Sequence, residues 1–429
     1  MVLFIASNIF SQQDSLWTLD KCIDYALKQN IQIRKSELST GKAELYYNQA
    51  KAQRYPSLNG SVNQNFSWKR SSSSSGSDYT FSNGSGYSVS SGVTIYNGSR
   101  LSNQIKQTQL EIQSSEYSLE TTKESISLSI LDAFLQVLYS EEQVKNSIKQ
   151  LESTGEQLRL AGERLNLKVI SAADYSQVKS QLASEKLTLA NSEKQLSIAK
   201  VTLMQLMELP ANNGFNIAEP DLSGILNELR IPDVKKVYET SLAIKPQIKN
   251  ASVNKQIAGL DEKIARAGFY PSLTASAGIT TRFSSEGNGA YVNQINEGLY
   301  PTAGISMAIP IYQRKQVKTN VEVAQLGYTD AELSETETRN QLRKSIEQAC
   351  LDVTSAQVQY EASLEKYNAT LESASLSEEK FNQGIINSVD YLVSKTNLIV
   401  AESELLQSKY NLIFSYKVLD FYEGIPLSL

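Results

Sequence analysis

The chain repeats itself at a nearly constant offset, and this duplication limits what it can fold into. Four leucines recur 216 residues after four earlier ones; the pairs are Leu182 and Leu398, Leu189 and Leu405, Leu196 and Leu412, and Leu203 and Leu419. The tetrapeptide Tyr-Pro-Ser-Leu occurs at 55–58 and again at 270–273. Agreement between an apolar ladder and a turn motif is typical of an internal duplication. The sequence therefore predicts two structural repeats, 12–210 and 233–429, with a connector over 211–232.

Proline placement defines where long helices are permitted. Its positions are Pro56, Pro210, Pro220, Pro232, Pro246, Pro271, Pro301, Pro310 and Pro426. Because proline in a helix interior costs about 3 kcal/mol, the proline-free spans 57–209 and 311–425 permit very long helices. The seven-residue leucine ladders, with Ser or Ala between the leucines, predict antiparallel coiled-coil hairpins that occupy the second part of each repeat. Shorter helices are expected at 16–54, broken near Asn30, and at 234–268.

Four segments instead alternate apolar and polar residues with a period of two, which predicts β-strands. They lie at about 57–69, 87–96, 272–283 and 302–311. The intervening stretches, 71–86 and 284–297, are rich in Ser, Gly and other polar residues, and we interpret them as surface loops. The fold class is thus mainly α, with four strands in each duplicated chain.

Strands with one apolar and one Ser/Asn-rich face suit a membrane β-barrel. An isolated four-stranded sheet in hydrocarbon would leave backbone groups at its edges without partners. Bacterial barrels have at least eight strands, so two or more protomers would have to share one barrel. The alternative is a soluble four-stranded sheet.

Composition argues against several classes of function. The chain of 429 residues has no histidine and a net charge of −5, with acids and bases interspersed. We therefore expect no enzyme activity, no cofactor or metal site and no nucleic-acid partner. Cys22 and Cys350 are too few for a disulfide framework. Two free thiols are expected, and a single disulfide between them is the alternative.

The N-terminus has the pattern of a secretory signal. An apolar stretch over 1–10 is followed by Ser-Gln-Gln-Asp, although a basic leading segment is missing. We interpret 1–11 as a truncated signal segment; the alternative is a short buried N-terminal segment.

Two short stretches, 165–175 and 381–392, have the layout of matching hairpin tips. At the 216-residue offset, Asn166 falls on Asn382, Asp174 on Asp390 and Tyr175 on Tyr391. Gly384 is expected to end one helix in a left-handed conformation, with Asn387 and Ser388 capping the next. We expect function to concentrate at these tips.

These features together resemble the TolC-like outer-membrane efflux proteins. The resemblance covers essentially the whole mature chain and rests on the duplication, the two Tyr-Pro-Ser-Leu entries into strand pairs, and the tip at 381–392. It implies a homotrimer with a 12-stranded barrel in the outer membrane of a Gram-negative bacterium, continued by an α-helical barrel in the periplasm. The implied partners are outer-membrane lipid, a periplasmic adaptor and an inner-membrane pump.

The resemblance also assigns roles at the tips. A pore constriction is implied at Asp390, Val393, Ile386 and Phe381. In the family pattern Val393 stands where a second acid occurs, Ile386 where an arginine occurs, and Phe381 where a gate-linking tyrosine occurs. These replacements suggest a mouth held shut more by apolar contact than by polar links. Helix capping is the alternative role for Asp390.

Adaptor docking at the tips is implied for a second set of residues, which consists of Gly384, Asn382, Asn166, Lys168 and Asp174. Lys168 stands where the family has glycine. Capping is again the alternative for Asp174 and Gly384.

The expected function is a passive exit duct, either for small molecules in tripartite efflux or for protein in type I secretion. A soluble, secreted coiled-coil scaffold is the alternative from a different class. The sequence does not name the exported substrate.

Overall fold

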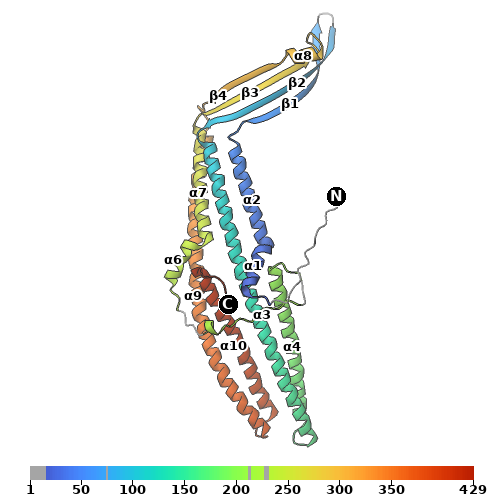
Figure 1. Cartoon of the computed structure of the whole chain (residues 1–429), viewed down its shortest axis with the longest axis vertical. Coiled ribbons are helices and arrows are strands. Elements are labelled where there is room, and N and C mark those ends of the chain that lie inside the picture. Colours follow the sequence, from blue (N-terminus) through green and yellow to red (C-terminus); the bar gives the residue numbers. More distant parts are fainter. Residues whose placement is uncertain (1–15, 74–75, 211–213, 227–230) are drawn as a thin grey trace. The chain divides into compact units, whose positions relative to one another are not determined.

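The computed structural model describes residues 16–73, 76–210, 214–226 and 231–429, in two halves with the same order of elements. The first half contains α1 (Leu19–Gln29), α2 (Ile31–Ala52), β1 (Ser57–Ser73), β2 (Gly76–Asn97), α3 (Arg100–Asn166) and α4 (Ala172–Leu206). The second contains α6 (Val234–Ile244), α7 (Pro246–Arg266), β3 (Ser272–Ser284), β4 (Tyr300–Ala308), α9 (Gln316–Asn382) and α10 (Ser388–Glu423). Short helices α5 (Ser223–Leu226) and α8 (Tyr291–Glu297) lie in the connector and between β3 and β4 (Figure 1).

The predicted long helices are confirmed. Helices α3 and α9 each have 67 residues, and α9 begins and ends 216 residues after α3 does. Each is followed by a second long helix, α4 or α10, as the leucine ladders predicted. The break near Asn30 is also present, between α1 and α2.

The chain forms two compact units. One comprises the described residues up to Glu37 together with Ser118–Ile248 and Thr338–Leu429; the other comprises Leu38–Tyr117 and Lys249–Glu337. The first unit therefore contains both helical hairpins and the second contains the sheet. The division cuts across the repeats, and the repeat boundaries given above remain an interpretation.

The core of the first unit has two buried clusters. The first consists mainly of residues of the first repeat, with Leu406, Tyr410 and Ile413 of α10 packed against them, and the second consists of residues of the second repeat. In one, Cys22 of α1 and Phe134 of α3 pack with Leu203 of α4. In the other, Val237 of α6 and Ile346 of α9 pack with Leu419 of α10. The duplicated sequence thus builds two similar cores where the short helices meet the long ones. Cys22 and Cys350 are free, buried thiols in separate clusters, as expected.

The second unit contains one antiparallel sheet of order β1-β2-β3-β4 (Figure 1). The loop predicted at 71–86 is wrong, because β1 continues to Ser73 and β2 begins at Gly76. Ser and Gly suggested a loop, but the alternation in Tyr79-Thr80-Phe81-Ser82 satisfies a strand as well. Residues 74–75 lie outside the described part.

Three other boundaries differ from the predictions. Strand β4 runs from Tyr300 to Ala308 rather than 302–311, and Pro310, which lacks an N–H donor, lies just beyond it. The expected loop at 284–297 contains α8. The helix expected at 234–268 breaks at Lys245, because the residue before a proline disfavours the helical region.

The signal segment proposed at 1–11 lies outside the described residues. Among the residues that are described, no helix combines the length and the apolar character needed to cross a membrane.

The turn from β2 into α3 depends on Gly98, whose φ is +65°. A Cβ atom there would lie 2.8 Å from the carbonyl oxygen of Ala267 and 2.8 Å from Cβ of Tyr270. Glycine is therefore required both by its backbone conformation and by the close approach of the other half of the sheet unit.

We predict that Gly98→Ala lowers stability by about 2 kcal/mol or more, since it adds left-handed strain to a steric clash. Gly41→Ala is the matched control: Gly41 is helical and a Cβ atom there would have no neighbour within 4 Å, so the change should stabilise by about 0.5–1 kcal/mol. Thermal unfolding in detergent, followed by circular dichroism, measures both. Equal effects of the two substitutions would contradict the role assigned to Gly98.

Candidate functional site

The two hairpin tips of the first unit end their long helices in the same way. At the first tip, Val169 donates its N–H to Arg164 O over 2.9 Å, and Lys168 donates to Leu165 O over 2.9 Å. At the second, Ile385 donates to Lys380 O and Gly384 donates to Phe381 O, over 2.9 and 3.1 Å. This pair of bonds defines a Schellman cap, in which the residue after the helix adopts the left-handed conformation.

Gly384 occupies that left-handed position with φ +75°, as expected, and Lys168 occupies it in the first tip with φ +58°. The backbone turn is thus retained although a lysine has replaced the glycine. A left-handed lysine carries strain that a glycine would not.

The next helices begin with side-chain caps. Ser171 and Asp174 form a capping box: Ser171 Oγ accepts from the Asp174 N–H over 3.1 Å, while Asp174 Oδ2 accepts from the Ser171 N–H over 3.2 Å. At the second tip Asn387 Oδ1 accepts from the Asp390 N–H over 2.9 Å. Ser388, which we expected to help with this cap, instead points to the other tip.

A hydrogen bond joins the two tips directly. Ser388 Oγ, which is buried, donates to Asp174 Oδ1 over 2.6 Å. Hydrogen bonds from Ser171 and then from Ser388 hold the pKa of Asp174 below its usual value of 3.8. The carboxylate therefore stays ionised, and remains an acceptor for both serines, through the neutral and mildly acidic range.

An aromatic stack lies beside this hydrogen bond. The rings of Phe381 and Tyr391 are parallel, with centroids 4.8 Å apart. Arg164 of the first hairpin lies over Phe381, with its Cζ 6.0 Å from the ring centroid, and its Nη2 contacts Asn382 O and Oδ1 at 3.4 Å. These groups line a small cleft of about 20 Å³ between the tips.

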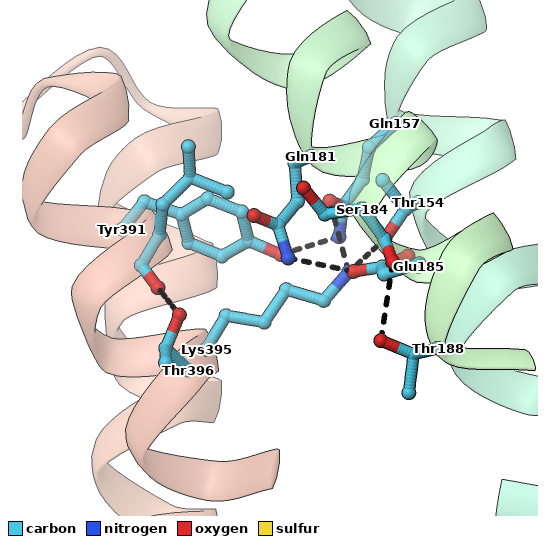
Figure 2. Close-up of polar contacts among 10 residues, drawn as sticks. Thr154, Gln157, Gln181, Ser184, Glu185, Thr188, Tyr391, Lys395 and Thr396 are labelled. Atoms are coloured by element: carbon cyan, nitrogen blue, oxygen red, sulfur yellow. Dashed lines mark hydrogen bonds and ion pairs between the residues drawn. The ribbon is translucent and has the colours of Figure 1, made fainter. Parts of the chain in front are cut away.

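A buried polar network connects the hairpins farther along the helices (Figure 2). Lys395 of α10 donates to Thr154 Oγ1 and, over 3.4 Å, to Gln157 Oε1 on α3. Its Nζ lies 3.8 Å from Glu185 Oε1 of α4, and both side chains are less than a tenth exposed. Gln157 also donates to the hydroxyl of Tyr391. One lysine thus contacts both helices of the opposite hairpin.

Burial controls the charge properties of this network. It lowers the pKa of Lys395, an effect that the nearby carboxylates of Glu185 and Glu378 oppose. Burial also raises the pKa of Tyr391 to about 12, so its hydroxyl stays protonated at neutral pH. Glu185 Oε1 accepts from Gln181 over 3.0 Å, whereas its Oε2 has no hydrogen-bond partner. An ion pair this deeply buried is costly to break from one side.

The opposite face of α10 is exposed. Val389 and Val393 are each more than half exposed, and Asp390 is exposed between them. Tyr391, Leu392 and Lys395 of the same helix are buried. The start of α10 therefore has an inward face that contacts the first hairpin and an outward face with one carboxylate and two valines.

The structure separates the residues for which a pore role was predicted. Asp390 and Val393 share the outward face, and Ile386 lies half-buried at the turn before it. Phe381 instead stacks inward on Tyr391. The residues with predicted docking roles, Gly384, Asn382, Asn166 and Lys168, lie exposed at the turns, and Asp174 is half-buried in its cap. Whether any of these residues forms a constriction or binds an adaptor remains a prediction.

Sequence reasoning missed the residues that join the hairpins, chiefly Lys395, Glu185 and Ser388. A signal was present. Buried positions of α4 recur every seven residues, at Val178, Glu185, Ser192 and Ala199. A charged residue in such a row is expensive unless it is paired, so Glu185 should have suggested a cationic partner.

No metal site was expected. Within the described parts of the chain, no group of three or more Cys, Asp or Glu side chains is placed to hold a metal ion.

Comparison with known proteins agrees with this fold. The model of the "Outer membrane efflux protein" family matches residues 22–208 and 237–422, one segment in each half. The Campylobacter jejuni CmeC outer membrane channel superposes with a TM-score of 0.80 at 18% identity, covering 95% of this chain and 85% of that one. The outer membrane protein VceC from Vibrio cholerae gives 0.76 at 17% identity, covering 95% and 96%.

A curated relative is also found, an uncharacterized protein of Haemophilus influenzae. It is 21% identical over 250 residues, which is 58% of this chain and 52% of the relative, so the match spans about half of the relative's length.

By fold, the chain is similar to outer-membrane channels: it has a duplicated, mainly helical structure with a small antiparallel sheet. The family match covers most of both halves, and the chain belongs to the outer membrane efflux protein family. It is accordingly a protein of the Gram-negative outer membrane that extends into the periplasm.

The two Schellman caps predict opposite effects on stability when glycine is removed from one and introduced into the other. Gly384→Ala should destabilise by about 1–2 kcal/mol, because a Cβ disfavours φ of +75° although nothing else is near it. Lys168→Gly should stabilise by about 1 kcal/mol by relieving the same strain. Melting temperatures in detergent measure both changes. Destabilisation by Lys168→Gly would show that the lysine side chain contributes more than its backbone strain costs.

The buried ion pair predicts strong coupling. Lys395→Met leaves Glu185 buried without its cation and should cost about 3–5 kcal/mol, whereas adding Glu185→Leu should recover much of that loss. Lys179→Met is the matched control, since Lys179 is the exposed counterpart of Lys395 one repeat earlier. Additive effects of the two single substitutions in a thermal double-mutant cycle would rule out the coupling.

Proposed function

We propose that this protein is the outer-membrane exit duct of a tripartite efflux or type I secretion system. Three copies would share one 12-stranded barrel, and the tips of their helical hairpins would form the periplasmic mouth. The duct itself would be passive, and coupling to a periplasmic adaptor and an inner-membrane transporter would supply direction. The soluble-scaffold alternative is set aside because the chain belongs to the efflux protein family.

The sheet is the observation that carries this proposal. Its order leaves one edge of β1 and one edge of β4 without a partner strand among the described residues. One face is apolar yet exposed: Leu58 is 75% and Ile305 is 72% exposed. The other face carries hydroxyl pairs such as Ser61 with Ser88, 2.7 Å apart. Pairing β1 with β4 of the next protomer would complete the backbone hydrogen bonds, with the apolar face toward lipid and the hydroxyls toward a watery lumen.

The long helices support the same assembly. Helix α9 has a row of exposed large apolar residues, namely Val323, Leu326, Leu333, Leu351 and Val358. Apolar rows of this kind on a long helix need a partner surface. Neighbouring protomers of a helical barrel would supply it.

The proposed mouth follows from the two faces of α10. The inward face is held by Lys395, Tyr391 and Ser388, so the outward face is the one free to meet its symmetry mates. Asp390 and Val393 on that face would form rings of three. The exposed turns at Lys168 and Gly384 would be the docking points for the adaptor.

Membrane extraction tests the assembly. The protein should resist extraction without detergent and migrate as a heat-modifiable trimer, and in planar bilayers it should give discrete conductance steps. Release as a soluble monomer by carbonate washing would overturn the proposal.

Asp390→Asn tests the mouth. We predict that it lowers cation selectivity and relieves block by multivalent cations, because three carboxylates at a narrow aperture concentrate cations. Glu379→Gln removes the same charge from the exposed end of α9 and serves as the control. Single-channel recording compares them, and unchanged selectivity in Asp390→Asn would exclude a constriction at this residue.

A further inference from the structure

The β1–β2 hairpin extends beyond the four-stranded part of the sheet (Figure 1). Strands β2 and β3 pair from Asn97 as far as Gly84, and β3 and β4 only as far as Thr280 with Tyr300. Strands β1 and β2 continue pairing to Ser73 and Gly76. A two-stranded ribbon of this kind is marginally stable alone, so its exposed surface needs a partner. We call the paired segments 65–73 and 76–84 the arm.

One face of the arm is aromatic. The rings of Phe66 and Phe81 are stacked with centroids 6.2 Å apart, and Trp68 lies 5.3 Å from Phe81. The guanidinium of Arg70 lies 5.9 Å from the ring centroid of Tyr79. Trp68 is 67% and Tyr79 is 64% exposed. The arm therefore presents a cluster of aromatic rings with a cation at its outer end.

The opposite face of the arm is polar. Ser67 and Ser82 hydroxyls are 2.7 Å apart, and Lys69, between Trp68 and Arg70, shares this face because successive strand residues alternate. By the same alternation the aromatic face continues the apolar face of the sheet, through Val62 to Leu58. The aromatic cluster is thus an extension of the proposed lipid-facing surface.

A second group of exposed aromatic residues lies at the other end of the sheet, where the strands meet the helices. It consists of Tyr55, Tyr96, Tyr270 and Tyr312. From Tyr55 to Phe66 the chain advances eleven residues, or about 36 Å at ~3.3 Å per residue. With a strand tilt of ~40° this becomes about 28 Å, close to the ~25 Å apolar band of an outer-membrane barrel.

Aromatic side chains near the outer end of the sheet are not confined to the arm. Tyr291 of α8 packs against Phe283 of β3 with centroids 4.8 Å apart, and its hydroxyl lies 2.6 Å from that of Tyr87 on β2. Phe283 pairs with Ser85, and by strand register both share the face of Trp68. Aromatic side chains therefore cross the sheet at the level where the arm begins.

We propose that the aromatic face of the arm lies at the outer interface of the membrane, where Arg70 contacts the phosphate of outer-leaflet lipid headgroups. The inference rests on the proposed barrel and adds its outer boundary and a lipid contact. Aromatic rings favour the interface, and a guanidinium two residues farther out matches phosphate in charge and geometry.

Trp68 can report its own depth. The chain has two tryptophans, so Trp17→Phe leaves Trp68 as the only one. The trimer is reconstituted in phosphatidylcholine vesicles with bromine near the headgroup or near the chain ends. Trp68 fluorescence should be quenched more by the shallow bromines. Quenching by aqueous iodide with no quenching by either lipid would overturn the proposal and place the arm in water, over the lumen or against a protein partner.

A second reporter separates this inference from the barrel itself. Val62→Trp, made with Trp17→Phe and Trp68→Phe, places a tryptophan within the proposed lipid-facing band. If neither reporter is quenched by brominated lipid, the barrel assignment fails. If only the reporter at 62 is quenched, the barrel stands and the interfacial arm is wrong.

The phosphate contact is tested by replacing each of two adjacent cations, Arg70 and Lys69, separately by glutamine. Thermal stabilisation of the trimer by lipid A is compared with stabilisation by dephosphorylated lipid A. Arg70→Gln should lose most of the difference and Lys69→Gln should keep it, since Lys69 lies on the opposite face. Equal loss in both variants would indicate a net-charge effect and overturn the headgroup contact.

Discussion

The equal length of α3 and α9 is the constraint on which the hairpin tips depend. Both helices have 67 residues, and the turns that follow each have the same Schellman hydrogen bonds. At the tips themselves Ser388 reaches Asp174, and Arg164 lies over Phe381, so the two tips end level with each other. One turn more in either helix would displace its tip by about 5.4 Å and separate these groups.

Near the tips the contact between the hairpins is polar, although each hairpin is packed by leucine and small residues. Lys395 and Glu185 occupy inward positions where an apolar residue would pack without a desolvation cost. What an ion pair adds is register, because Lys395 must meet Thr154, Gln157 and Glu185 together. A leucine seam tolerates sliding by a heptad, whereas this contact has one position.

The sequence predicted the fold better than the site for a physical reason. Helix length, strand alternation and duplication are periodic, so the absence of proline from 57–209 and the leucine ladders sufficed for the long helices. The arm was missed because Ser and Gly outweighed the alternation of Tyr79 and Phe81. Contacts such as Lys395 with Glu185 join residues 210 positions apart, and no local pattern specifies which charges will meet.

The two repeats show that backbone geometry has been retained where side-chain chemistry has changed. Lys168 adopts the left-handed conformation of Gly384, and Arg314 adopts that of Gly98 at the equivalent turn into α9. The left-handed strain at Lys168 and Arg314 is tolerated because each turn lies between long helices or strands that fix both of its ends.

The same reasoning applies to the proposed mouth, where Val393 and Ile386 stand in place of the charged residues of the family pattern. With the inward face of α10 held by a buried ion pair and a hydrogen bond, the outward face would not have to supply polar links, and apolar contact between protomers would be sufficient to close the proposed mouth. In the proposed duct, specificity of alignment therefore comes from contacts within a protomer and closure from contacts between protomers.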